Sequence, residues 1–223
     1  TLKWRPDGES TTWSVGVDAQ ALDLSFLQLA AHRFDLPMDL AGTGALSGSA
    51  TWTGDFDRTE IALERAQFRD LRLFAPDYLG RDELKFERVQ MEGEYEVRGD
   101  VCTITAGQLE CDAGRMAVEG SFVWPVGTSD VWAQLAETAQ QADLRLAGRV
   151  DLARLAATLP HTLHIRQGAV IEAGTLTFEL DGRRQSDELH WTARVETSEL
   201  AARRDGERYT LNTPLRITAK ASR

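Results

Sequence analysis

The sequence predicts a mainly β protein: one long antiparallel sheet accompanied by two or three short helices. Three observations predict this class. Apolar and charged residues alternate with a period of two over several long segments, tight-turn sequences separate those segments, and helical spacing of apolar residues occurs only in short stretches. Several of the expected strands run to about ten residues or more, whereas strands of globular proteins average about 5–6.

The clearest strand covers residues 85–99. Val89, Met91, Tyr95 and Val97 occupy alternate positions, and charged residues, mostly glutamates, stand between them. This alternation is typical of a half-buried strand with one apolar and one charged face. The charged face must meet water, because burying unpaired carboxylates is costly. What covers the apolar face is therefore the functional question.

Before that strand, the chain is expected to form a short opening strand into a turn at Pro6-Asp7-Gly8, three further strands and a helix. Residues 13–17 alternate as a strand, and Asp23 then stands as the N-cap of an amphipathic helix over residues 23–32. A glycine-punctuated strand follows over residues 42–54, in which Gly48 suits a bulge or a close approach of backbone.

The next strand, which opens at Ile61, carries a signal for irregular pairing. Its apolar residues stand at odd positions through Leu63, at even positions from Ala66 to Phe68, and at odd positions again from Leu71. Side chains alternate strictly along a regular strand, so each change of parity predicts a β-bulge. Bulges add twist and curl to a sheet.

Residues 101–111 leave two alternatives. The favoured one is a single long strand, bulged at Gly107 and followed by a turn at the sequence Asp-Ala-Gly. In the other, a two-residue turn at Ala106-Gly107 places Cys102 opposite Cys111, close enough to consider a disulfide. The cysteines leave the redox compartment open.

The second half of the chain repeats the order of the first. Residues 131–141 have weak helical spacing, residues 144–150 alternate as a strand, and Asp151 opens a short helix that Pro160 closes. Strands follow to the C-terminus, the first of them ending in a turn at Asp181-Gly182.

The two short helices indicate an internal duplication, because Asp23 and Asp151, each followed by leucine, stand 128 residues apart. Each helix is preceded by a strand and followed by a proline-containing exit and a glycine-bearing strand. The expected units are residues 1–125, with a helix near 23–32, and residues 126–223, with a helix near 151–159.

Composition and charge narrow the function classes. The 223 residues are 42% hydrophobic and 27% charged, which excludes a disordered or membrane-embedded chain. The net charge of −10 repels phosphate groups, so neither nucleic acid nor an anionic membrane surface is expected as a partner. Because Thr1 begins in mid-pattern, we expect a piece of a longer protein whose anchor or targeting segment lies elsewhere.

The sequence carries no recognised catalytic signature, so we expect no enzyme, no cofactor and no metal. Phosphate-binding loops and the nucleophile elbow are absent. His161 and His164 lack the helical spacing of a metalloprotease motif and are better explained as a surface pair. Glu92, Glu94 and Glu96 are better explained as a solvated strand face than as a cation or glycosidase site.

The sequence resembles the AsmA-like superfamily of bacterial envelope proteins, which includes the TamB-type proteins. The resemblance rests on the helices that begin at Asp23 and Asp151, on the glycine-punctuated strand over residues 42–54, and on small-residue hairpins such as residues 112–122. It spans most of the chain, through patterns of turn and alternation rather than a catalytic signature.

This resemblance implies a taco-shaped sheet, curled so that its concave face is an open apolar groove. It implies a periplasmic location within a protein anchored in the inner membrane, and a role in lipid transport or in outer-membrane and envelope assembly. The implied partners are phospholipid or another acyl-chain lipid, envelope proteins and the rest of the parent chain.

The apolar stripes admit two functional interpretations. Such stripes usually form the core of a sealed sandwich, but the long strands, the few helices and the resemblance favour an open groove that holds acyl chains. The candidate groove residues are Leu63, Val89, Met91, Tyr95, Val97, Ile104, Val118 and Phe122. The alternative is a β-sandwich module for binding or scaffolding glycan or protein, with Trp52, Trp124 and Trp191 as an exposed platform.

Overall fold

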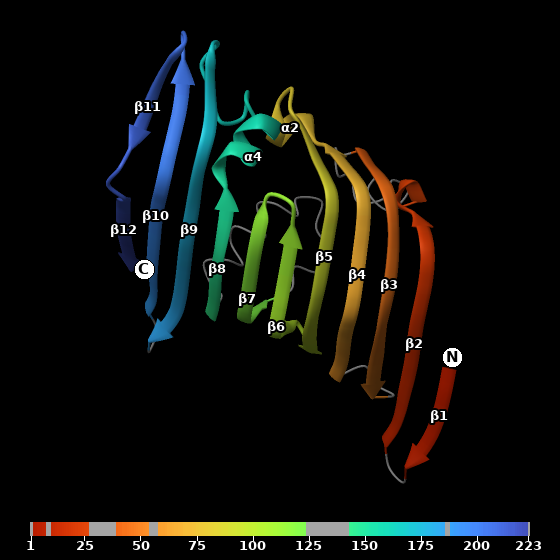
Figure 1. Ribbon diagram of the computed structural model, residues 1–223. Coiled ribbons are helices and arrows are strands. Elements are labelled where there is room, and N and C mark those ends of the chain that lie inside the picture. The colour runs from red at the N-terminus through yellow and green to blue at the C-terminus, as the bar shows by residue number, and fades with distance from the viewer. Residues whose placement is uncertain are drawn as a thin grey trace.

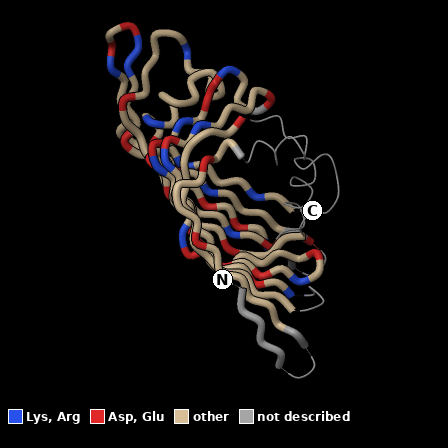
Figure 2. The backbone as a smooth tube through the Cα atoms, turned by 90° about the vertical axis from the view of Figure 1, so that its right-hand side faces the viewer, with Lys and Arg blue, Asp and Glu red and all other residues tan. Residues whose placement is uncertain are grey.

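Twelve strands form one antiparallel sheet that does not close on itself in the computed structural model (Figure 1). The structure describes residues 2–7, 10–26, 39–53, 58–123, 143–185 and 188–222. Strands β1 to β11 lie side by side in chain order, and β12 pairs with β10. Viewed from its edge, the sheet is one twisted layer along which charged residues are spread (Figure 2). The predicted mainly β, long antiparallel sheet is confirmed.

The elements have the following bounds. The strands are β1 (Leu2–Asp7), β2 (Ser10–Asp23), β3 (Asp39–Thr53), β4 (Arg58–Phe74), β5 (Glu83–Arg98), β6 (Val101–Cys111), β7 (Gly114–Val123), β8 (Asp143–Asp151), β9 (Ala169–Gln185), β10 (Glu188–Arg204), β11 (Glu207–Leu211) and β12 (Leu215–Ser222). The helical elements are the 3₁₀-helix η1 (Leu24–Phe26), α2 (Pro76–Leu79) and α4 (Leu152–Thr158). β4, β9 and β10 are each 17 residues long, as the long alternation predicts.

Both changes of parity in β4 coincide with irregular pairing, which confirms the predicted bulges. The β4–β5 register shifts between Leu63 and Ala66. The second change falls at Asp70, whose φ is 51°, and there the β3–β4 register shifts opposite Gly42. Each irregularity returns the following apolar side chains to the face that the earlier ones occupy.

β6 is one strand, so the favoured alternative for residues 101–111 is confirmed and the hairpin is wrong. Cys102 and Cys111 lie at opposite ends of β6, and both are free. The chain turns after Cys111, which pairs with Gly114 of β7. The predicted bulge lies just before Gly107, where the β6–β7 register shifts.

Other local predictions have mixed outcomes. The predicted turn at Gly182 is wrong: this glycine lies inside β9, because its missing side chain makes room for the ring of Trp191 on β10. The loop expected before β5 contains the one-turn helix α2. Residues 27–32 of the first predicted helix and all of the predicted helix over residues 131–141 lie outside the described residues. Within the described residues, no helix is long and apolar enough to cross a membrane.

The two predicted helix starts lie at the same level of the sheet. Asp151 caps α4 by accepting a hydrogen bond from the backbone N–H of Arg154 at 3.0 Å. Asp23 accepts one from the backbone N–H of Ser25 at 2.9 Å, at the start of η1. Both aspartates are paired with a threonine on the next strand, and both helices stand at the upper end of Figure 1. The division into two repeat units stays a prediction.

The buried core of the described residues is thin. The buried apolar residues are mostly small: Leu24, Ala66, Ala75, Val89, Cys102, Ala113, Ala156, Leu159 and Ala201. The whole chain exposes 15306 Å², whereas a compact monomer of 24.7 kDa is expected to expose about 10,000 Å². A single layer has this property, because a sheet buries its apolar face only against a second layer.

Residues 152–168, which comprise α4 and the segment after it, are here called the strap. The strap lies at the ends of the short strands β6 to β8 (Figure 1). Leu152 of α4 packs near Gly174 of β9 on one side. On the other side, Asp82 beside β5 accepts a hydrogen bond of 2.6 Å from the backbone N–H of Thr162 and bonds Nδ1 of His161 at 2.8 Å. The strap thus ties β9 to the β4–β5 connection, across the three strands between them.

The side chain of Asp82 is only 3% exposed, and it is the one buried charged residue among those described. Burial alone would raise the pKa of this carboxyl. The hydrogen bonds from Thr162 and His161 outweigh burial and lower the pKa from 3.8 to about 2. The carboxylate is therefore ionised when it holds the strap.

Asp82 should make the stability of the fold fall in acid. Its pKa is lower in the folded state than in the unfolded state, so its contribution is present above about pH 4 and is lost as the pH falls towards about 2. Urea unfolding midpoints at several pH values between 5 and 2 should fall more steeply for the wild type than for Asp82→Asn. The exposed Asp77→Asn, on α2, is the matched control; parallel slopes in all three proteins would contradict this role of Asp82.

Candidate functional site

Cross-strand pairing gathers most of the large apolar residues in the middle of the strands on one face of the sheet. Directly paired residues point to the same face, and neighbours along a strand point to opposite faces. Following the pairs from strand to strand gives five parallel rows, numbered 1 to 5 from the lower to the upper end of Figure 1. Within these rows only Thr59 and Thr197 are neither apolar nor glycine.

The rows show how complete this apolar face is. Row 1 consists of Trp4, Trp13, Trp52, Thr59, Val97, Cys102 and Phe122. Row 4 consists of Ala19, Leu46, Ala66, Met91, Leu109, Met116, Gly148, Phe178, Val195 and Ile217. The intervening rows are polar, for example Gln67, Gln90, Glu110, Arg115, Arg149, Thr177, Glu196 and Arg216.

All eight predicted groove residues lie on the apolar face. Val97 and Phe122 are in row 1, Tyr95 and Ile104 in row 2, Leu63 and Val118 in row 3, Met91 in row 4 and Val89 in row 5. Val89 is buried and the other seven are half-buried. The sequence prediction of the site missed the residues of β8, β9, β10 and β12 that continue the same rows. The alternation of apolar and polar residues in these strands is the signal that could have identified them.

Large rings on this face lie flat over glycines of the neighbouring strand. A Cβ added to Gly148 would stand 2.5 Å from the Phe178 ring, with which it is paired. The same relation holds for Gly182 beneath Trp191 at 2.5 Å and for Gly44 beneath Phe68 at 2.7 Å. Each ring makes its contacts within its own sheet, so the face has low relief rather than projecting side chains.

The apolar face is also electrically neutral. Burial raises the pKa of the Tyr95 phenol, and the nearby Cys102 adds to this effect. Burial likewise raises the pKa of the Cys102 thiol. Both groups therefore stay protonated well above neutral pH. Charges are confined to the other face, where, for example, Arg98 lowers the pKa of Glu96.

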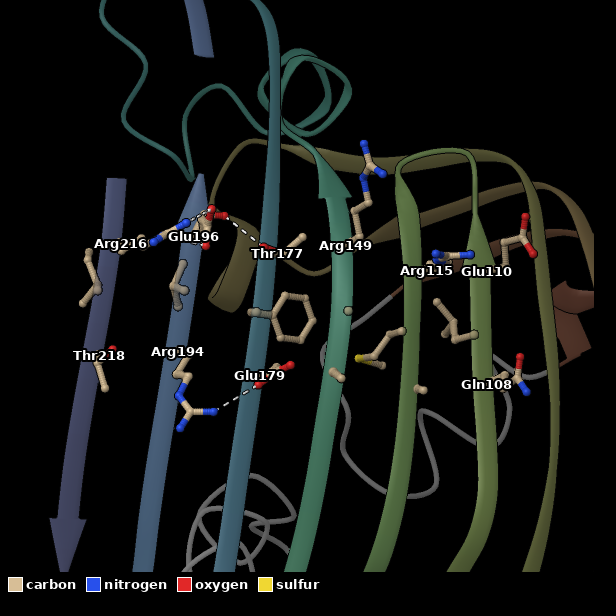
Figure 3. A pocket seen from close by; sticks show the side chains of 18 residues that line it. Gln108, Glu110, Arg115, Arg149, Thr177, Glu179, Arg194, Glu196, Arg216 and Thr218 are labelled. Atoms are coloured by element: carbon tan, nitrogen blue, oxygen red, sulfur yellow. Dashed lines mark hydrogen bonds and ion pairs between the residues drawn. The ribbon is translucent and has the colours of Figure 1, made fainter. Parts of the chain in front are cut away.

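A hollow of about 890 Å³ on β6 to β10 and β12 is distinct from the predicted groove (Figure 3). None of the eight predicted groove residues lines it, and its walls are mainly two polar rows that flank row 4. Arg194 is 3.5 Å from Glu179, and Arg216 is 2.9 Å from Glu196. These arginines are 67% and 73% exposed, so the hollow is a space between solvated side chains rather than a built site.

The histidine pair has structural roles. His161 bonds Asp82, and Nδ1 of His164 lies 3.0 Å from the carbonyl oxygen of Thr162. No group of three or more histidine, cysteine or acidic residues is arranged to hold a metal within the described parts of the chain.

The tryptophan platform of the alternative interpretation does not assemble. Trp52 on β3 and Trp191 on β10 are separated by seven strand spacings, about 34 Å across the sheet, and Trp124 lies outside the described residues. All twelve described strands belong to one sheet, so these residues contain no second sheet with which to build a sandwich.

No family model, curated protein or solved structure matches this chain.

The flat rings give a direct test of this geometry. Gly148→Ala should destabilise the fold by about 1–3 kcal/mol, because the new methyl overlaps the Phe178 ring and forces it out of its place. Gly16→Ala is the matched control: it lies within a strand and has no atom within 4 Å of the added Cβ, so it should be neutral or stabilise by up to about 1 kcal/mol. Urea unfolding measures both changes. Equal effects would mean that the ring does not depend on the glycine.

Proposed function

We propose that this chain is a non-enzymatic segment of an AsmA-like envelope protein whose apolar sheet face holds lipid acyl chains, in lipid transport or envelope assembly. The observation that carries the proposal is the set of five apolar rows, interrupted only by Thr59 and Thr197, with rings lying flat over glycines. The sequence resemblance supports the same role, with a periplasmic location and an inner-membrane-anchored parent protein.

The chemistry of the face favours a hydrocarbon ligand over a polar one. In the rows, the polar side-chain atoms are the hydroxyls of Thr59, Thr197 and Tyr95, the two cysteine thiols and the indole N–H groups. A glycan or an extended peptide would lose its hydrogen bonds to water there and regain few of them. An acyl chain loses none and gains about 0.8 kcal/mol for each methylene removed from water.

The low relief of the apolar face also favours a conformationally flexible ligand. A protein partner packs by interdigitating side chains with those of the facing layer. Phe68, Phe178 and Trp191 are instead turned down onto their own sheet. A flexible acyl chain needs no projecting side chains to interlock with, because dispersion and the hydrophobic effect are non-directional.

The exposure of the face supports the same conclusion. Ile217 and Leu215 are 56% and 53% exposed, and Val17 and Ile61 are 45% and 40% exposed. All four belong to the apolar rows. A ligand that covers them removes from water part of the apolar surface that the single layer leaves exposed.

Charges placed on the apolar face should remove bound lipid. Met91→Asp with Val97→Asp should abolish phospholipid that co-purifies with the chain in native mass spectrometry, because each carboxylate would be desolvated beneath an acyl chain. The matched control, Gln90→Asp with Thr218→Asp, adds two carboxylates to the opposite face and should keep the lipid. Unchanged lipid content in the first variant would overturn the proposal.

A second pair of substitutions protects the test against misfolding. Leu215→Asp with Ile217→Asp changes exposed residues of β12, so the circular dichroism spectrum should stay unchanged. We expect this variant to lose part of the bound lipid while it remains folded. A folded variant with full lipid content would count against the C-terminal part of the face as a binding surface.

A further inference from the structure

We propose that a second copy of this chain adds its strand β12 to the free part of the β2 edge, so that the sheet and its apolar face continue from one copy to the next. This interface does not depend on a bound lipid. It follows from the pairing that the two edges lack, from the rows that end there and from the charges beside those rows.

The sheet has two open edges, at β2 and at β12, which stand at opposite sides of Figure 1. β1 pairs with β2 only as far as Val15, and within the described residues no strand pairs with residues 17–23 on that side. β12 pairs with β10 alone. An unpaired edge is a template for another chain, because its outward backbone N–H and C=O groups can extend the ladder.

Rows 3, 4 and 5 cross the sheet from one open edge to the other. Their ends are Val17, Ala19 and Leu22 on β2, and Ala219, Ile217 and Leu215 on β12. Between these strands every member of the three rows is half-buried or buried. At the edges, by contrast, Val17 is 45% exposed and Ile217 is 56% exposed. The exposed apolar surface of these rows therefore lies where a further strand would cover it.

Antiparallel pairing joins the two edges in register. β12 runs opposite to β2, because nine successive antiparallel pairings separate them. When Ala219 of one copy stands opposite Val17 of the next, Ile217 stands opposite Ala19. Rows 3 and 4 then continue across the junction with their apolar side chains on one face.

The irregularity of β2 sets the upper limit of this pairing and β1 sets the lower one. Ala21 has a φ of 54° and belongs to the bulge through which β2 pairs with β3. The same bulge brings Leu22 opposite Leu215, so that row 5 continues as well. Below row 3 the pairing stops, because Leu2 of β1 already occupies row 2 of that edge.

The charges beside the rows are complementary. Residues 17–23 include two aspartates and no basic residue, whereas β12 includes two basic residues and no acidic one. In this register Asp18 stands opposite Thr218 of the other copy and diagonally beside Arg216 and Lys220. Arg216 already pairs with Glu196 at 2.9 Å, but Lys220 has no ion pair among the described residues. An edge lysine usually discourages strand pairing, and here it meets a carboxylate.

The two joined surfaces differ from each other, so the interface is heterologous. Each added copy leaves one β2 edge and one β12 edge free, and the association does not close at a dimer. The result is a row of copies with a continuous apolar face.

Cross-linking of two singly substituted chains tests the junction. Val17→Cys and Ala219→Cys place thiols at opposite edges, about 43 Å apart along the sheet, so a short thiol cross-linker can join them only between copies. A mixture of the two variants should give a cross-linked dimer in denaturing electrophoresis, and neither variant alone should do so. Val170→Cys is the matched control, because it is 59% exposed but lies on β9; it should not cross-link to Val17→Cys.

Sedimentation velocity measures the association itself. The wild type should form species larger than a dimer as its concentration rises. Asp18→Lys should abolish them by placing a third cation beside Arg216 and Lys220. Asp100→Lys, the same change of charge in the exposed turn after β5, should keep them. A monomer at every concentration, or equal association of the two variants, would overturn the interface. A cross-link formed by Ala219→Cys alone would indicate pairing between two β12 strands and would overturn it too.

Discussion

The whole structure depends on cross-strand register. Each strand is matched to its neighbour so that apolar residues pair with apolar residues from β2 to β12. If the register of one pair slipped by a single residue, the apolar side chains of one strand would move to the polar face of the sheet. The irregularities near Leu63 and at Asp70 belong to this constraint, since they correct the phase of β4 where its sequence departs from strict alternation. Register thus converts a simple alternation into one continuous apolar surface.

Glycine has a specific part in that surface. In a two-layer protein, Phe68 or Phe178 would project into a facing layer and gain its contacts there. Here each ring finds its contacts over the glycine of the adjacent strand, Gly44 or Gly148. The glycines that weaken individual strands therefore allow one layer to provide contacts for its own aromatic side chains, and these rings do not project away from the sheet.

The sequence contains much of this architecture, but not all of it. Alternation predicts the strands, the bulges and the common face of the eight candidate residues, because each depends on local periodicity. It does not predict that Gly182 continues a strand, since that depends on the Trp191 ring of another strand. Nor does it predict the contact of Asp82 with His161, which joins residues 79 positions apart. The charged hollow was also not foreseen, because it arises from side chains of six strands together.

The chain-order arrangement of the strands has a consequence for the folding route. Each strand from β1 to β11 pairs with the next along the chain, so most contacts are local, and the contact order is low for an all-β protein. Folding can begin at any hairpin and proceed outward, with small loop-closure entropy at each step. The bond between Asp82 and Thr162 must wait until β5 to β8 are in place. The apolar face of these strands is therefore formed before the strap is tied across their upper ends, and the bond of Asp82 reinforces a spacing between β5 and β9 that strand pairing has already set.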